Sequence, residues 1–86
     1  MYEKIIESYV TKLNLNDIYS FSNKENFNIS EEDAKTILFY IKKYWYIILK
    51  KDPEDIFLKL KEEVNINTYN KVIELYKKYK TKIDLM

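Results

Sequence analysis

SEEDAKTILFYIKKYWYIILKK, residues 30–51, is the longest and most apolar helical pattern in this chain of 86 residues. Ser30 can accept a hydrogen bond from a free amide of the first turn, and the helix dipole favours the three acidic residues that follow it. Asp52 and Pro53 end the pattern, because a residue before proline is pushed out of the α region and proline cannot donate to the preceding turn. We therefore predict a long central helix over about residues 30–51.

The apolar residues of this stretch form a regular stripe and a surplus outside it. The stripe has the three- and four-residue spacing of one helical face: Ala34, Ile37, Leu38, Ile41, Trp45 and Ile48. The apolar residues outside the stripe make the second half of the predicted helix apolar almost all round, which is typical of a helix buried on several sides. The run 44–49 is rich in aromatic and β-branched residues that would also suit an extended segment, but we predict that it continues the helix.

The rest of the chain shows further helical patterns separated by short breaks. Apolar residues recur at helical spacing over residues 2–13, 15–23, 53–64 and 69–83. The fourth pattern starts with Asp52 as a cap and Pro53 at the first helical position. We predict breaks near Asn14, over residues 23–30, at Asp52 and over residues 65–68. The predicted fold class is all-α, a single domain over residues 1–86 with four to five helices around the central one and no sheet.

The residue types that the chain lacks exclude several kinds of chemistry. It contains no cysteine, histidine, glycine or arginine, so thiolate and imidazole ligands and phosphate-binding glycine loops are excluded. We therefore expect no metal and no cofactor. Adjacent acids such as Glu31 and Glu32 lie at helix starts or on solvated faces, which predicts no catalytic residue and no enzyme activity. Turns fall to residues that tolerate the left-handed conformation: Asn14, Asn26, Asn28 and Asn65.

Two compositional features concern the location and source of the protein. The longest uninterrupted apolar run, residues 44–49, is far below the roughly 20 residues that a membrane-spanning helix needs, so we expect no membrane partner. The first ten residues lack a basic region followed by an apolar block, which predicts a cytoplasmic location. The abundance of Ile, Asn, Tyr and Lys is typical of coding bias in an AT-rich genome.

Several motifs together resemble those of a small family. They are the short segment 15–18, the loop and acidic turn of residues 27–34 leading into Ile37, and helices starting near Asp52 and around Val72. In this combination the chain resembles the uncharacterised YqfT-like proteins of Firmicutes, a domain of unknown function. The resemblance implies a helical fold over most of the chain and no activity. Members tend to break the central helix with a glycine and polar residues, whereas this chain continues through residues 42–45, which leaves open whether the helix is continuous to Lys51.

A protein-interaction module is the function that the sequence favours. Nine tyrosines, four phenylalanines and one tryptophan exceed what a small core easily encloses, and tyrosine and tryptophan are favoured at interfaces. We expect a partner protein or a second copy of the chain to bind the second half of the central helix, at Tyr40, Tyr44, Tyr46, Ile47 and Leu49. A small inhibitor or an immunity-type bundle would show the same pattern, so those roles remain alternatives.

Weak nucleic-acid binding is a further alternative. Residues 1–36 carry four lysines and seven acids, whereas residues 37–86 carry eleven lysines and seven acids. The basic half could contact phosphates in a non-specific, salt-sensitive manner, through Lys71, Lys77, Lys78, Lys80 and Lys82. A solvated lysine face is the simpler interpretation, because the chain has no arginine to read base edges and a net charge of only +1.

Overall fold

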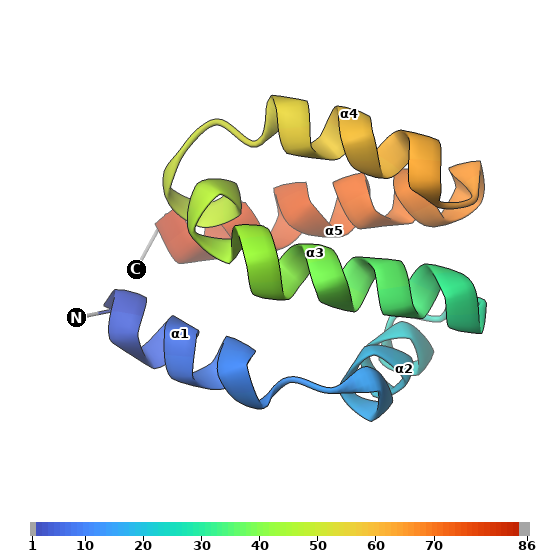
Figure 1. Cartoon of the computed structure of the whole chain (residues 1–86), viewed down its shortest axis with the longest axis horizontal. Coiled ribbons are helices and arrows are strands. Elements are labelled where there is room, and N and C mark those ends of the chain that lie inside the picture. Colours follow the sequence, from blue (N-terminus) through green and yellow to red (C-terminus); the bar gives the residue numbers. More distant parts are fainter. Residues whose placement is uncertain (1, 85–86) are drawn as a thin grey trace.

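The computed structural model describes residues 2–84, with the side chains of residues 3–81. Five helices follow one another along the chain (Figure 1): α1 (Tyr2–Lys12), α2 (Leu15–Lys24), α3 (Glu31–Lys50), α4 (Glu54–Glu63) and α5 (Ile66–Asp84). The described residues contain no strand, so the prediction of a small all-α bundle is confirmed.

The starts of α2 and α3 follow from the capping residues. Asn14 and Asp17 form a reciprocal box, in which the Asn14 Oδ1 accepts from the Asp17 N–H at 3.0 Å and the Asn14 N–H donates to Asp17 Oδ2 at 2.9 Å. The Ser30 Oγ accepts from the Asp33 N–H at 3.1 Å. Residues 44–49 are helical and α3 is unbroken to Lys50, which answers the question of its continuity.

Two predicted helix starts were wrong in detail. Pro53 lies before the first helical residue of α4, because the Asp52 Oδ1 accepts from the Glu54 N–H at 3.0 Å and holds residues 52–54 in a turn. Helix α5 begins at Ile66 instead of residue 69, since the Asn65 side chain accepts from the Asn67 N–H at 2.8 Å and starts the helix inside the predicted turn.

Asparagine replaces glycine at one turn. Asn26, which follows α2, has φ of 59° and is the only described residue in the left-handed region. Asparagine tolerates this conformation because its short polar side chain bonds locally. The turn sends residues 27–30 back toward the start of α3.

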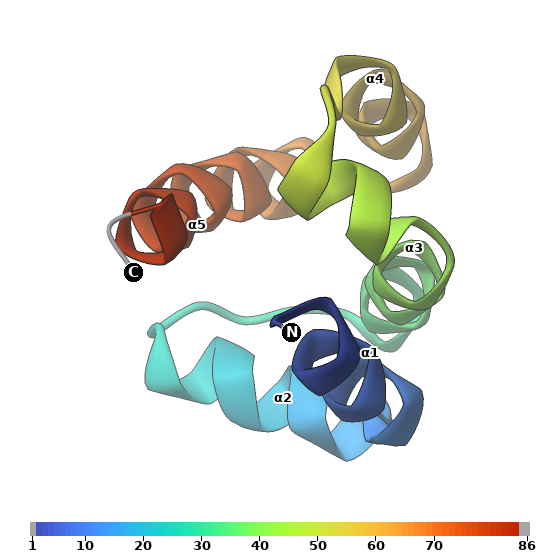
Figure 2. The same cartoon turned by 90° about the vertical axis from the view of Figure 1, so that its left-hand side faces the viewer.

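Helix α3 is the centre of the bundle. Helices α1 and α2 pack on one side of it and α4 on another, and α5 packs on α4 (Figures 1 and 2). Two lysines connect neighbouring helices by donating hydrogen bonds to carbonyls at helix ends, where the α-helical N–H partner is missing. The Lys42 Nζ donates to the carbonyls of Val10 and Thr11 at 3.1 and 3.0 Å, and the Lys80 Nζ donates to the Leu49 carbonyl at 2.8 Å.

The best-packed region lies between α3 and α4. Its buried residues are Tyr40, Ile56, Leu60 and Val64, and half-buried side chains from α3, α4 and α5 pack against them. Of the predicted stripe on α3, only Ala34 is fully buried, and the other five residues are half-buried. The stripe therefore faces an incompletely filled part of the bundle.

Candidate functional site: an apolar cleft inside the bundle

A large apolar cleft lies inside the bundle, and the packed α3–α4 core forms part of its wall. Its volume is about 660 Å³. Viewed along α3, the five helices form an incomplete ring, with α2 and α5 on either side of its gap (Figure 2). The core residues in the wall are Tyr40, Ile56, Phe57 and Leu60. The rest of the apolar lining comes from the following residues: Tyr9, Val10, Leu13, Ile18, Phe21, Phe27, Ile29, Ile37, Ile41, Ile48, Leu49, Val72, Leu75, Tyr76 and Tyr79.

Helical periodicity explains how these side chains converge on the cleft. On α5, Val72, Tyr76 and Tyr79 are separated by four and three residues, so they share one face. On α3, Ile37, Ile41 and Ile48 belong to the predicted stripe, and all three line the cleft. The apolar faces predicted for α3 and α5 therefore exist, but a cleft separates them.

The size of the cleft is large for so small a protein. At about 24 cal/mol per Å³, a sealed and dry apolar cavity of this volume would cost about 16 kcal/mol. Small domains have a total stability of only about 5–15 kcal/mol. A void of this size therefore cannot be sealed and dry. The cleft is open to solvent, and an apolar group that enters it is favoured because apolar surface is removed from water.

Four side chains close the gap between α2 and α5, and we call them the α2–α5 clasp: Phe21, Glu25, Lys78 and Tyr79. The Phe21 and Tyr79 rings are tilted, with centroids 5.8 Å apart. The Tyr79 hydroxyl donates to Glu25 Oε2 at 2.9 Å, and the Lys78 Nζ lies 3.4 Å from Glu25 Oε1. The clasp therefore joins the two ends of the helical ring through side chains.

The hydrogen bond in the clasp changes the acidity of both partners. The bond from Tyr79 holds the pKa of Glu25 below its ordinary value, and the charge of Lys78 acts in the same direction. The same bond, donated to a carboxylate, raises the pKa of Tyr79. Both shifts favour the carboxylate and the neutral phenol, which is the state in which the clasp is closed.

Three polar residues on the cleft wall are already engaged within the fold, and two others, Ser20 and Lys24, lie at exposed positions. Asp17 belongs to the capping box of α2, the Tyr79 hydroxyl bonds Glu25, and the Lys80 Nζ bonds the Leu49 carbonyl. Within residues 3–81, no buried polar side-chain atom lacks a partner. The cleft therefore presents apolar surface and few groups that could orient a polar molecule.

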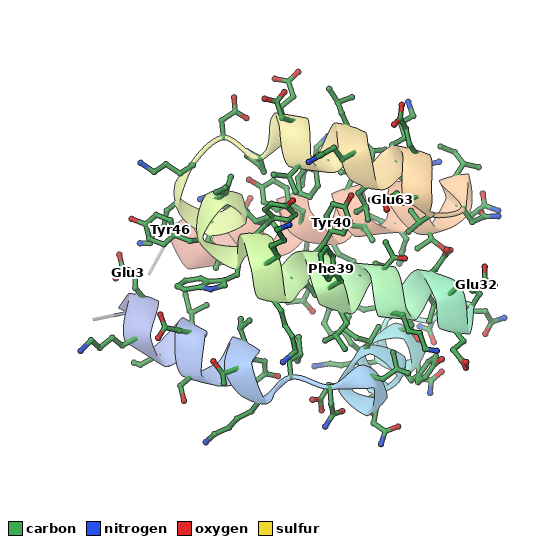
Figure 3. All side chains as sticks on the ribbon, viewed as in Figure 1. Glu3, Glu32, Phe39, Tyr40, Tyr46 and Glu63 are labelled. Atoms are coloured by element: carbon green, nitrogen blue, oxygen red, sulfur yellow. The ribbon has the colours of Figure 1, made fainter. Side chains whose placement is uncertain are left out.

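The predicted interface residues lie in three different places. Tyr40 is buried between α3 and α4, where its hydroxyl donates to Glu63 and its ring lies 5.4 Å from that of Tyr44 (Figure 3). Ile47 also packs against this core, whereas Leu49 lines the cleft. Tyr46 is 45% exposed near the end of α3. The structure thus divides this group among the α3–α4 core, the cleft and the surface.

The predicted phosphate contacts are mostly engaged elsewhere. Lys71 pairs with Glu74 at 3.4 Å and lies 5.9 Å from the centre of the Phe27 ring. Lys78 belongs to the clasp, Lys80 bonds α3, and Lys77 is exposed. The side chain of Lys82 lies outside the described residues.

Sequence reasoning missed several residues of the cleft and the clasp. Leu75 is buried on the cleft side of α5 but was absent from the predicted face, and Phe21 and Glu25 were assigned no role. Phe21 follows Ile18 by three residues, and this spacing is the one signal that could have placed it on the inner face of α2. No local pattern marks Glu25, because its partners lie more than fifty residues away.

In comparisons with models of known families, with curated proteins and with solved structures, the chain matches none of them. The resemblance to the YqfT-like family therefore stays a prediction. Among the described helices, none is both long and apolar enough to cross a membrane. In the same part of the chain, no group of three or more acidic side chains is placed to hold a metal ion.

Proposed function

We propose that this protein is an interaction module that binds an amphipathic helix of a partner protein in the apolar cleft. The observation that carries the proposal is the cleft itself, to which all five described helices contribute apolar side chains. Binding of this kind lays the apolar face of one helix into a hydrophobic groove, with anchors at positions i, i+3, i+4 and i+7.

The length of the cleft suits a helix. Along α3 it extends from Ile37 to Leu49, which at 1.5 Å per residue is about 18 Å, or slightly more than three helical turns. A partner segment of that length presents three to four anchor side chains on one face. Tyr9 and Phe21, two aromatic side chains of the kind enriched at protein interfaces, are exposed at the edge of the cleft.

The chemistry of the walls favours an apolar helix face over a polar small molecule. Small-molecule sites carry a few placed polar groups that fix the orientation of the ligand. In this cleft, Asp17, Tyr79 and Lys80 already use their polar atoms within the fold. The face of a helix needs no such groups, because the backbone of the helix is already hydrogen-bonded internally.

A second copy of the chain is the alternative partner that a specific observation favours. Ile5 and Tyr9 lie one turn apart on α1 and are 62% and 69% exposed. In a homodimer, this edge of one copy could enter the cleft of the other. Roles as an inhibitor or an immunity-type protein are special cases of partner binding, whereas nucleic-acid binding gains little support because Lys71, Lys78 and Lys80 have partners within the fold.

The test uses a set of designed peptides and a variant that blocks the cleft. Each peptide is about 15 residues long, because shorter isolated helices are marginal in water, with leucines at positions i, i+3, i+4 and i+7 and with acidic, neutral or basic flanks. Val72→Phe places a larger side chain in the cleft, and Leu58→Phe is the matched control on the exposed face of α4. Calorimetry should show that Val72→Phe weakens binding by at least about tenfold, or 1.4 kcal/mol, whereas Leu58→Phe leaves it unchanged.

Two results would contradict the proposal. One is that no peptide binds the wild-type protein, and the other is that both variants bind as tightly as the wild type. Sedimentation of the free protein separates the second copy from a foreign partner: a dimer that Val72→Phe dissociates and Leu58→Phe preserves would identify the partner as another copy.

A further inference from the structure

Contacts between α2 and α5 lie across one side of the cleft. Phe21 of α2 and Tyr79 of α5 both line the cleft, and their ring centroids are 5.8 Å apart. A partner helix that enters between α2 and α5 must therefore part this contact.

We propose that the α2–α5 clasp is the gate of the cleft, closed in the free protein and opened by the incoming helix. This inference rests on the proposed function, because it concerns entry to the same site. Helices α2 and α5 face one another across the gap in the helical ring (Figure 2). The clasp side chains span this gap, and Phe21 and Tyr79 belong both to the clasp and to the cleft wall. Parting these two helices widens the cleft along its length.

The clasp is the weakest of the contacts that hold the ring together. It consists of one ring pair, one hydrogen bond and one ion pair, in which the Lys78 side chain is 48% exposed and the Glu25 side chain 11% exposed. Salt weakens the ion pair from its exposed lysine end, and Phe21 of the ring pair is itself exposed to solvent. By contrast, α4 is held against α3 by a buried apolar core, so separation at α2 and α5 costs less than separation at α4.

The connections of α2 permit such a movement. Residues 25–30 join α2 to α3 without regular structure, and they include the left-handed turn at Asn26. A second contact across the same gap is the Lys71 Nζ above the Phe27 ring at 5.9 Å, which is also a surface interaction. Changes of backbone angle in this loop would carry α2 away from α5, while Ile18 of α2 stays buried.

The first experiment measures the clasp in the free protein. The chain has no cysteine, so Asn23→Cys and Lys77→Cys place spin labels only on exposed positions of α2 and α5. Double electron–electron resonance should give one short distance, and the double variant Glu25→Gln/Tyr79→Phe should add a longer one. Tyr46→Phe, which removes the hydroxyl of an exposed residue outside the clasp, should leave the distances unchanged. Identical distributions in all three proteins would overturn the gate.

The second experiment adds the leucine-bearing peptides described above. The longer distance should become dominant on binding, and Glu25→Gln/Tyr79→Phe should bind about three- to tenfold more tightly, because the protein no longer has to break the clasp first. If the peptides bind but neither the distance nor the affinity changes, the gate is wrong and the proposed function stands. If no peptide binds any form, the proposed function is wrong, and the distances in the free protein still decide whether the clasp holds α2 against α5.

Discussion

The two sides of α3 differ in how completely they are packed. Tyr40 is buried in a core with Ile56, Leu60 and Val64, and all of these except Val64 also form part of the cleft wall. Ile41, the next residue, lines the cleft and is only half-buried. Both sides have apolar residues at helical spacing, so apolarity alone does not decide which side is filled. The difference teaches that one helix can stabilise the fold with one face and present a binding surface with another.

This comparison also predicts how stability is distributed. The α3–α4 core buries its apolar side chains without help from a partner. Helices α1 and α2 pack on α3, but they leave the cleft between themselves and α5. We therefore expect local opening to begin between α2 and α5, because these helices are joined by the clasp side chains and not by the buried core.

The largest effect should come from the α3–α4 core. Leu60 is 3% exposed, and Leu60→Ala should lower the free energy of unfolding by about 2–5 kcal/mol, because it leaves a cavity among packed side chains. Leu58, two residues earlier on the same helix, is 55% exposed, and Leu58→Ala should change stability by less than about 0.5 kcal/mol. Urea titrations of both variants measure the difference. Similar losses in the two variants would show that α4 does not pack as described.

Replacing valine with phenylalanine should change stability differently in the packed core and in the cleft. Val64 is buried in the packed core, and Val64→Phe should cost about 1–3 kcal/mol because the site is already full. Val72 lines the cleft, so Val72→Phe should be neutral or stabilising by up to about 1 kcal/mol through added apolar burial. Thermal unfolding of the two variants measures both values. A loss at Val72 as large as that at Val64 would mean that the cleft is closed in solution.

Alkaline pH should report on the packed core. Burial, together with the hydrogen bond to Glu63, raises the pKa of Tyr40 from 10.0 to about 12. The neutral phenol is therefore favoured in the fold, so its contribution to stability is fully present below pH 10 and is lost as the pH rises from 10 to about 12. Tyr40→Phe should reduce this slope to the part that Tyr79 contributes, because the pKa of Tyr79 is also raised, whereas Tyr46→Phe should leave the slope unchanged. The same slope in Tyr40→Phe and in the wild type would assign it to another group.

The smallest effect on stability should appear at acidic pH, where the clasp beside the cleft loses a charged group. The pKa of Glu25 is held below its ordinary value of 4.5, chiefly by the hydrogen bond from Tyr79. Its contribution to stability is therefore present above pH 4.5 and is lost as the pH falls through the lower pKa of the folded state. Glu25→Gln should flatten the stability curve in that window, and Glu62→Gln on the exposed face of α4 serves as the control. Equal curves for Glu25→Gln and the wild type would show that the clasp adds nothing to stability.

Local signals determined most of the fold. Caps such as Ser30 and Asn14 and the three-to-four spacing of apolar residues act within one or two turns, so the sequence predicted the order and type of the helices. The starts of α4 and α5 were displaced because Asp52 and Asn65 each bond an amide two residues further on. The spacing of apolar residues does not predict which of these short-range hydrogen bonds forms, so it does not predict the exact residue at which a helix starts.

The candidate site is formed by residues that lie far apart in the sequence, so no local sequence pattern predicts it. The stripe that includes Ile41 was predicted to be core, yet the angle between the two halves of the bundle leaves it facing a cleft. Tyr40 was assigned to the surface, and it is buried because α4 covers that side of α3. The clasp joins Glu25 to Tyr79 across more than fifty residues, so only the folded chain brings its members together.

The central claim is that the cleft side of α3 binds a partner helix while the α4 side stays packed. Intermolecular nuclear Overhauser effects between a bound leucine-bearing peptide and the methyl groups of the protein test it most directly. The account predicts contacts to Ile41, Val72 and Leu75 and none to Leu58 or Ile66, which are exposed on α4 and α5. Contacts to Leu58 or Ile66 without contacts to the cleft would contradict the account.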